Sequence, residues 1–140
     1  MSLPISIPPS TTAEKIIPYV NEKTGGSKNF AVANNPEFLR EGHCWEDFLG
    51  ADRIVIGCDD ARAREKLIKL YAPMNIPIKC VTPSTGEFIK YLSNTLLATL
   101  ISFSNEMAQI ADTIGDVEVA EAFRILHMDK RWSTINGGGC

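Results

Sequence analysis

Residues 53–82 read RIVIGCDDARAREKLIKLYAPMNIPIKCVT, and this stretch decides the fold class. It begins and ends with short apolar runs, Arg53–Cys58 and Ile78–Thr82, whose β-branched residues predict two strands. Between them, Asp60 is placed to cap a helix that runs to about Tyr71 and is followed closely by a proline. A strand, a helix and a second strand in this order favour a mostly parallel sheet flanked by helices.

The residues before this unit predict one more helix and one more strand. Thr11 followed by Glu14 fits a capping box, so a helix is expected to start there and to run to about Glu22. Pro18 falls inside it and predicts a kink or a shortened first turn. The apolar segment Phe30–Ala33 predicts a buried strand.

The pattern changes after residue 83, where Ser84 and Glu87 form a second possible capping box. From there a helix can run without interruption to Gly115, and Asp116 can cap a further helix to about His127. The long segment carries apolar or small side chains at spacings of three and four: Phe88, Leu92, Leu96, Thr99, Phe103, Met107, Ile110 and Ile114. This spacing is typical of one continuous helical stripe.

A helix this long and this apolar has to be covered on more than one side. A second copy of the same helix is the simplest source of that cover, so the sequence predicts a homodimer formed through residues 84–115. The alternative is burial of the helix against the sheet domain of the same chain.

Composition excludes several classes of protein. The 140 residues carry a net charge of −3 and no dense basic run, so nothing favours nucleic-acid binding. The longest apolar stretch, 96–103, is too short to cross a bilayer, and no secretory signal is visible, so a cytoplasmic protein is expected. The four cysteines include no C-x-x-C pair, which favours free thiols. A zinc site from His43, Cys44, Cys58 and Cys80 is the alternative, although it lacks close ligand pairs.

Two polar segments carry candidate chemistry. Glu37 and Glu41 lie on a loop directly after the strand predicted at 30–33, where α/β proteins place ligands. Lys90 and Asn94 are four residues apart and share one face near the N-terminal end of the long helix. A base, a cation and an amide donor suit chemistry at a carbonyl carbon. The alternatives are solvated loop acids and a surface ion pair between Lys90 and Glu87.

Several motifs in one order resemble the UDP-glucose 6-dehydrogenase family. They are NPEFLREG at 35–42, EDFL at 46–49, DRIVIG at 52–57, EFIKYLSN at 87–94 and FSNEMA at 103–108, with IPPSTT at 7–12 similar to the loop before the acidic motif. The resemblance covers nearly the whole chain, and the RIVIG run is closer to the UDP-glucose branch than to the GDP-mannose branch.

The resemblance implies oxidation of a sugar C6 alcohol to a carboxylate with NAD and a cysteine thiol, through a thiohemiacetal and a thioester. In that reaction Glu37 matches the general base that activates water. Lys90 and Asn94 match the pair that stabilises negative charge on oxygen. Glu37 and Lys90 are therefore expected to lie within a few ångströms of each other and to face a common hollow.

Further roles follow from the same resemblance. Ser6 falls where the family usually has a threonine that holds a water molecule. Cys140 follows a glycine run that resembles the one carrying the nucleophilic cysteine, although the stretch before it is shorter, and an inert terminal thiol is the alternative. The loop expected to contact the nucleotide-sugar substrate consists of Phe38, Leu39, Arg40 and Glu41.

The chain departs from the family in lacking a glycine turn for the NAD pyrophosphate. No G-x-G-x-x-G follows a strand, and the glycine clusters at 25–26 and 137–139 do not lie between a strand and a helix. The chain therefore resembles a middle fragment, with an incomplete Rossmann-like, mostly parallel sheet at 1–83 and a helical dimerisation domain with the long central helix at 84–140. We expect the isolated chain to form no NADH from UDP-glucose. A non-catalytic dimerisation module, or a parent that uses GDP-mannose or UDP-N-acetylmannosamine, is the alternative.

Overall fold

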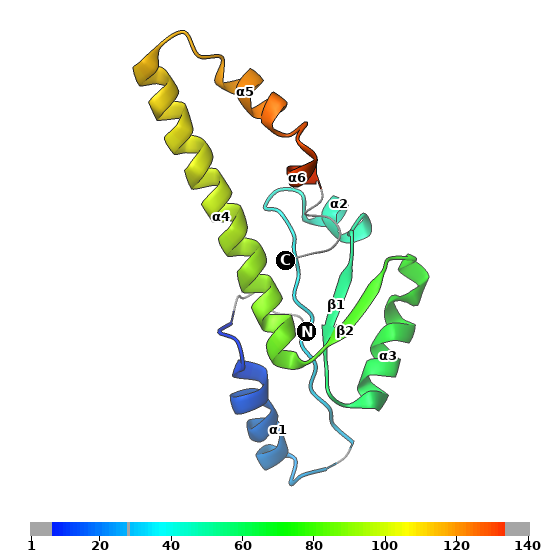
Figure 1. Ribbon diagram of the computed structural model, residues 1–140. Coiled ribbons are helices and arrows are strands. Elements are labelled where there is room, and N and C mark those ends of the chain that lie inside the picture. Colours follow the sequence, from blue (N-terminus) through cyan, green and yellow to red (C-terminus); the bar gives the residue numbers. More distant parts are fainter. Residues whose placement is uncertain (1–6, 28, 134–140) are drawn as a thin grey trace. The chain divides into compact units, whose positions relative to one another are not determined.

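The computed structural model describes residues 7–27 and 29–133, whose helices and strands are drawn in Figure 1. The chain divides into two compact units, Met1–Thr95 and Leu96–Cys140, and the boundary falls inside the long helix α4. The first unit holds the sheet, its neighbouring helices and the first turns of α4, whereas the second holds the rest of α4 and two short helices.

The strand–helix–strand unit forms as predicted. Strand β1 (Ile54–Gly57) pairs in parallel and in register with strand β2 (Ile78–Val81), and helix α3 (Ala61–Tyr71) connects them, followed by a short 3-10 turn. The Asp60 side chain accepts a hydrogen bond of 2.9 Å from the Ala63 backbone N–H, which is the predicted N-cap. The parallel pairing confirms the α/β class.

The core of the first unit is built on β1. Ile56 and Cys58 are fully buried and Ile54 is nearly so, because β1 is covered on both faces. The partly buried side chains that pack against these residues come from the segment before β1, from α3 and from the approach to β2: Ala33, Ala63, Leu67, Tyr71, Met74, Ile76 and Ile78.

The prediction of a strand at Phe30–Ala33 is wrong. This segment is irregular, Phe30 is 61% exposed, and only Asn34 pairs with β1, through an isolated antiparallel bridge to Gly57. The ladder cannot continue because the Asn35 side chain, at 2.7 Å, donates to the Val55 carbonyl, and the following proline has no N–H to donate.

The N-terminal helix forms without the predicted capping box. A π-helical turn, Thr12–Ile16, leads directly into α1 (Ile17–Lys23), and the Thr11 hydroxyl donates to the Pro8 carbonyl at 2.6 Å instead of capping the helix. The irregular turn lies just before Pro18, which has no N–H to complete the α-helical ladder. A kink or a shortened first turn was predicted at Pro18, and the structure has a π-helical turn before it instead.

Helix α4 (Pro83–Ile114) confirms the long central helix, but its start differs from the prediction. The Thr82 hydroxyl accepts a hydrogen bond of 3.2 Å from the Thr85 N–H, so Thr82 supplies the cap and the expected Ser84–Glu87 box does not form. Gly115 has φ +73° and its N–H bonds to the Ala111 carbonyl, which ends the helix with a left-handed residue.

The three remaining short helices among the described residues were anticipated only in part. Helix α5 (Val119–Leu126) lies within the predicted range, but Asp116 has φ +52° and does not cap it, since Glu118 is the residue before its first turn. Helix α2 (Cys44–Leu49) has no counterpart among the predicted elements, and α6 (Lys130–Ser133) ends the described chain.

Candidate functional site

Glu37 and Lys90 form an ion pair. Glu37 lies on the loop after the bridge at Asn34, and Lys90 lies on the second turn of α4; Lys90 Nζ is 3.1 Å from Glu37 Oε1. The two side chains are only 14% (Lys90) and 25% (Glu37) exposed. The sequence therefore correctly anticipated that these two groups meet, although their catalytic roles stay a prediction.

The loop holds the Glu37 carboxylate from its other side. Glu37 Oε2 accepts a hydrogen bond of 2.8 Å from the Leu39 backbone N–H, so both carboxylate oxygens have a partner. Phe38, between them in the chain, places its ring 5.6 Å from Lys90 Nζ and 4.2 Å from the guanidinium of Arg53. The ring thus lies against two cations, an arrangement that favours a fixed ring position.

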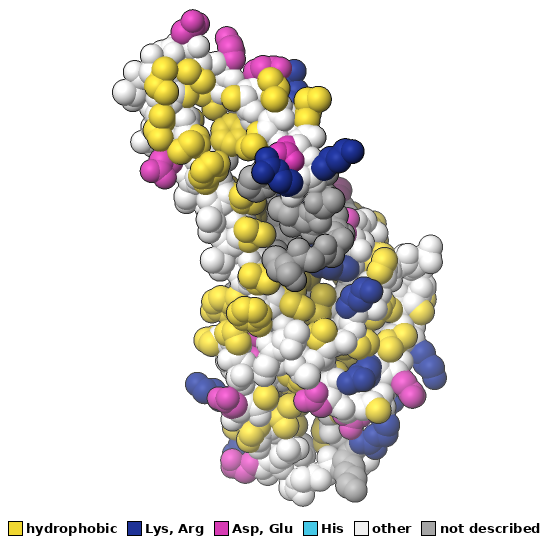
Figure 2. Space-filling model, in the orientation of Figure 1, with side chains coloured by type: hydrophobic (Ala, Val, Ile, Leu, Met, Phe, Trp, Pro, Cys, Tyr) yellow, Lys and Arg dark blue, Asp and Glu magenta, His cyan; other side chains and the backbone are white. Residues whose placement is uncertain are grey.

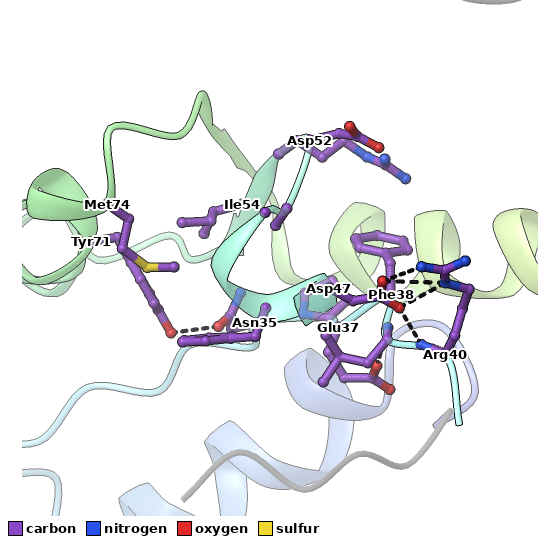
Figure 3. A pocket seen from close by; sticks show the side chains of 15 residues that line it. Asn35, Glu37, Phe38, Arg40, Asp47, Asp52, Ile54, Tyr71 and Met74 are labelled. Carbon is purple, nitrogen blue, oxygen red and sulfur yellow. Dashed lines mark hydrogen bonds and ion pairs between the residues drawn. The ribbon is translucent and has the colours of Figure 1, made fainter. Parts of the chain in front are cut away.

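Two neighbouring hydrogen bonds fix the start of this loop. The Tyr71 hydroxyl on α3 donates to Asn35 Oδ1 at 2.7 Å, and the Asn35 amide donates to the Val55 carbonyl on β1. Figure 3 shows Tyr71 and Asn35 pointing toward each other across the edge of a cavity. The acidic loop is therefore tied to both α3 and β1 just before Glu37.

Arg40 and Asp47 clasp the far end of the loop to α2 (Figure 3). The Arg40 guanidinium donates from both Nε and Nη2 to the Asp47 carboxylate, which also accepts from the Arg40 backbone N–H at 2.8 Å. These hydrogen bonds, those from the Arg40 side chain foremost, lower the pKa of Asp47 from the usual 3.8 to about 2. The Arg40 guanidinium stays largely exposed, although its Nε and Nη2 are bonded to this carboxylate.

Two cavities flank the loop within the first unit. One, of about 370 Å³, lies between the loop, α2 and β1 and is lined by Asn35 to Arg40 together with residues of 47–54 and two from 71–74. The other, of about 490 Å³, lies on the side of α4 and is lined by both Glu37 and Lys90. The common hollow expected for this pair is the second cavity.

Glu87 is not on the surface. It is 4% exposed, and its Oε1 accepts hydrogen bonds from the Thr12 N–H at 2.8 Å and from the Thr12 hydroxyl at 2.6 Å. The alternative of a surface pair between Glu87 and Lys90 is therefore wrong, because each of them has a different partner. The sequence analysis did not identify Thr12. The available signal was Glu87, a carboxylate in an otherwise apolar helix, because a carboxylate that is buried there needs a hydrogen-bond donor.

The remaining predicted site residues are not all brought together. Asn94 lies one turn after Lys90 on α4 and is exposed, and Glu41 lies on the exposed end of the acidic loop. Ser6 and Cys140 lie outside the described residues, so their predicted roles are untested. Within 7–133, leaving out residue 28, no three or more His, Cys, Asp or Glu side chains gather as a metal-binding group.

The described residues do not fit the pyrophosphate of a dinucleotide. The connection from β1 to α3 carries Asp59 and Asp60, and the Asp60 carboxylate itself occupies the first turn of α3. The connection from β2 to α4 is the single residue Thr82, whose hydroxyl caps that helix. Neither connection offers the glycine turn and free helix N-terminus that seat a pyrophosphate.

Comparison with known proteins gives the family. Residues 5–75 match the NAD binding domain of the UDP-glucose/GDP-mannose dehydrogenase family, and residues 84–139 match its central domain. The chain belongs to this family. The resemblance found in the sequence motifs is thereby confirmed, and with it membership among the nucleotide-sugar dehydrogenases.

Three members of this family illustrate how similar the chain is to known dehydrogenases. A UDP-glucose 6-dehydrogenase from Rickettsia bellii is 41% identical over 138 residues, which are 95% of this chain and 31% of that protein. The solved UDP-glucose dehydrogenase from Pyrobaculum islandicum is 44% identical with a TM-score of 0.84 and matches 90% of this chain and 29% of its own. A GDP-mannose dehydrogenase structure from Pseudomonas aeruginosa is 31% identical with a TM-score of 0.83, covering 89% and 29% of the two chains.

The chain thus spans less than a third of the length of these family members. Among the described helices, none is long and apolar enough to cross a membrane.

Proposed function

We propose that this chain is part of an NAD-dependent dehydrogenase that oxidises the C6 alcohol of UDP-glucose to the carboxylate of UDP-glucuronate. The observation that carries the proposal is the Glu37–Lys90 contact of 3.1 Å at the wall of a cavity, in a chain of this family. A carboxylate beside a partly buried ammonium offers both a base and a positive charge to the same small volume.

The proposed roles concern the sugar end of the reaction. Glu37 activates the water that hydrolyses the acyl intermediate, and its fixed position follows from the bonds to Lys90 and to Leu39 N–H. The Lys90 ammonium and the Asn94 amide stabilise negative charge on the reacting oxygen. Ser6 holding a water molecule and the Cys140 thiol as nucleophile belong to the same proposal.

The loop after Glu37 is proposed to bind the nucleotide sugar. Arg40 is largely exposed beside the cavity of about 370 Å³, and the guanidinium N–H groups that do not bond to Asp47 suit a phosphate oxygen. The backbone and side chains of Phe38, Leu39 and Glu41 complete this contact surface. NAD is the proposed hydride acceptor, since residues 5–75 match an NAD binding domain, but the described residues do not seat its pyrophosphate.

UDP-glucose is proposed over other sugar nucleotides because of the names of the more similar relatives. The two UDP-glucose dehydrogenases described above are 41% and 44% identical to this chain, whereas the GDP-mannose dehydrogenase is 31% identical. A UDP-N-acetylmannosamine dehydrogenase structure from Pyrococcus horikoshii is 30% identical. GDP-mannose and UDP-N-acetylmannosamine remain the competing substrates for the test below.

A homodimer through residues 84–115 is also proposed. Figure 2 shows hydrophobic side chains gathered over the second unit. Along α4 beyond residue 95 the exposed ones are Leu96, Leu97, Leu100, Ile101, Phe103, Ile110 and Ile114, each at least 44% exposed. Such a face is typical of an association surface. The proposed division into a cofactor-domain part at 1–83 and a dimerisation domain at 84–140 is supported by the ranges of the two family models.

The second candidate function applies to the chain by itself, as a dimerisation module that binds neither NAD nor sugar. The absence of a glycine turn from its sequence favours this reading for the isolated polypeptide. A cytoplasmic location is part of both proposals and is supported by Cys44, Cys58 and Cys80, which are free thiols.

A chimera tests the enzyme proposal. The matching segment of the Pyrobaculum islandicum dehydrogenase is replaced by residues 7–133 of this chain, and NADH formation is measured with each of the three sugar nucleotides. We expect activity with UDP-glucose, and a loss of about 100-fold or more in kcat for Lys90→Ala and Glu37→Gln. Near-normal rates in these variants would remove both residues from the proposed chemistry, and preference for another nucleotide would reassign the substrate.

The isolated chain provides the complementary measurement. We expect no NADH from UDP-glucose with the 140-residue chain, and sedimentation at micromolar concentration is expected to show a dimer. Turnover by the isolated chain would contradict the argument from the missing glycine turn, whereas a compact monomer would eliminate the dimer.

A further inference from the structure

Asn34 joins the two elements that carry the ion pair. Its backbone N–H and carbonyl both bond to Gly57 on β1 at 2.9 Å, and its side-chain amide donates to the Pro83 carbonyl at the start of α4 at 2.7 Å. The same amide lies 3.3 Å from the Thr12 hydroxyl. One residue thus ties the acidic loop, β1 and α4 together, three positions before Glu37.

The amide of Asn34 also opens a chain of buried hydrogen bonds. The Thr12 hydroxyl accepts from Asn34 and donates to Glu87 Oε1, which is one turn before Lys90 on the same helix. Thr12 is 1% exposed and Glu87 is 4% exposed, so these bonds are shielded from water. The start of α4 is therefore held at two points. Asn34 bonds directly to Pro83, and it is connected to Glu87 through the Thr12 hydroxyl.

Two glycines make room for this side chain. A Cβ atom built on Gly57 would lie 2.0 Å from Asn34 Oδ1, and one built on Gly86 would lie 2.4 Å from it. The Oδ1 atom of Asn34 is buried without a hydrogen-bond partner among the described residues. This atom therefore fills the space between strand and helix, while the backbone and the amide nitrogen of Asn34 make the hydrogen bonds. A larger residue at either glycine would force the two elements apart.

We propose that Asn34 is a positioning residue that sets the distance between Glu37 and Lys90. Glu37 is fixed to the Asn34 backbone through only two intervening residues, and Lys90 is fixed to the Asn34 side chain through the first turns of α4. The catalytic consequence of this rests on the proposed function, but the geometric role does not.

A zero-length cross-link measures the distance in the full 140-residue chain. A water-soluble carbodiimide activates the Glu37 carboxyl group; the Lys90 amine then displaces the activating group as a urea, loses a proton and forms an amide. The yield of the 37–90 peptide pair is read by mass spectrometry after proteolysis. We expect a clear cross-link in the unaltered chain, and a yield about tenfold lower in Asn34→Asp, which keeps the shape but cannot donate to Pro83.

Two further variants separate positioning from general damage. Gly86→Ala displaces Asn34 while leaving every donor and acceptor in place, and we expect the same fall in cross-linking. Ser84→Ala removes the 3.2 Å contact of Ser84 with Ser10 from the same helical turn without touching the loop, and the cross-link is expected to persist. Far-UV circular dichroism identifies any variant that has not folded.

The outcomes are separable from the test of function. An unchanged 37–90 cross-link in folded Asn34→Asp and Gly86→Ala chains overturns the positioning role, whether or not the chimera is active. In an active chimera, Asn34→Asp is expected to lower kcat by about 100-fold with little change in KM, because the ion pair and not the sugar-binding loop is displaced. A normal kcat beside a lowered 37–90 cross-link would support the positioning role and would remove the ion pair from the proposed chemistry.

Discussion

The strength of the Glu37–Lys90 pair can be worked out from its geometry and measured. At 3.1 Å, two unit charges in a medium of effective dielectric constant near 20 attract by about 5 kcal/mol. Desolvation of both groups offsets much of this energy, since the two side chains are only 14% and 25% exposed. We therefore expect a coupling free energy of about 2 kcal/mol, above the value of about 0.5 kcal/mol that is usual for an exposed pair.

A double-mutant cycle measures this coupling. Urea unfolding of the chain and of Glu37→Gln, Lys90→Met and the double variant gives four free energies, whose non-additivity is the coupling. The matched control is Glu22→Gln with Lys23→Met in the same unit, a pair at 3.5 Å with both side chains more than half exposed. Added salt is expected to abolish the coupling of the control pair and to leave most of the coupling between 37 and 90.

A coupling between 37 and 90 that is no larger than that of the control would refute this reasoning. It would mean that water reaches the pair freely and that the two groups lie together without a shielded environment. The proposed role of Lys90 in stabilising charge on oxygen would then lose its electrostatic basis.

Three more outcomes are expected from close contacts in the first unit. Gly57→Ala is expected to destabilise the chain by about 2–3 kcal/mol in urea unfolding, because its Cβ would meet Asn34 Oδ1; stability equal to that of the unaltered chain would contradict the close approach. Ile56→Ala, at a fully buried position in β1, is expected to cost about 3 kcal/mol, and a loss below about 1 kcal/mol would show that the core collapses around the cavity. The clasp by Arg40 lowers the pKa of Asp47 to about 2, so its contribution to stability is complete above the usual value of 3.8 and is lost as the pH falls toward 2. In Asp47→Asn that part of the acid loss is expected to vanish from a pH titration of unfolding, and an unchanged acid limb would refute the clasp.

Much of the fold could be predicted because its signals are local. The strands at 54–57 and 78–81, the helix capped by Asp60 and the long helix that ends at Gly115 each follow from periodicity and terminal residues within a few positions. The strand at Phe30–Ala33 was wrong because its apolar composition says nothing about partners. Its pairing with β1 is blocked by the side chain of Asn35, which takes a carbonyl that a ladder would use.

The two predicted capping boxes failed, unlike the predicted N-cap at Asp60. Thr11 with Glu14, and Ser84 with Glu87, have the spacing of capping boxes, but each box has a member that bonds elsewhere. The Thr11 hydroxyl donates to the nearby Pro8 carbonyl. Glu87 turns toward Thr12, which lies 75 positions away in the sequence. The residues around Glu87 can indicate that it needs a donor, but nothing local identifies Thr12 as that donor.

The sequence by itself determined the family, the parallel strand–helix–strand unit and the residue types at 37 and 90, because motifs and periodicity are carried by neighbours in the chain. Only the tertiary structure decided that Lys90 pairs with Glu37 and not with Glu87, and that Asn34 lies between two glycines. The physical reason is that a buried carboxylate needs a hydrogen-bond or charged partner. The folded chain supplies that partner from donors that lie close in space, and Lys90 for Glu37 and Thr12 for Glu87 are both distant in sequence.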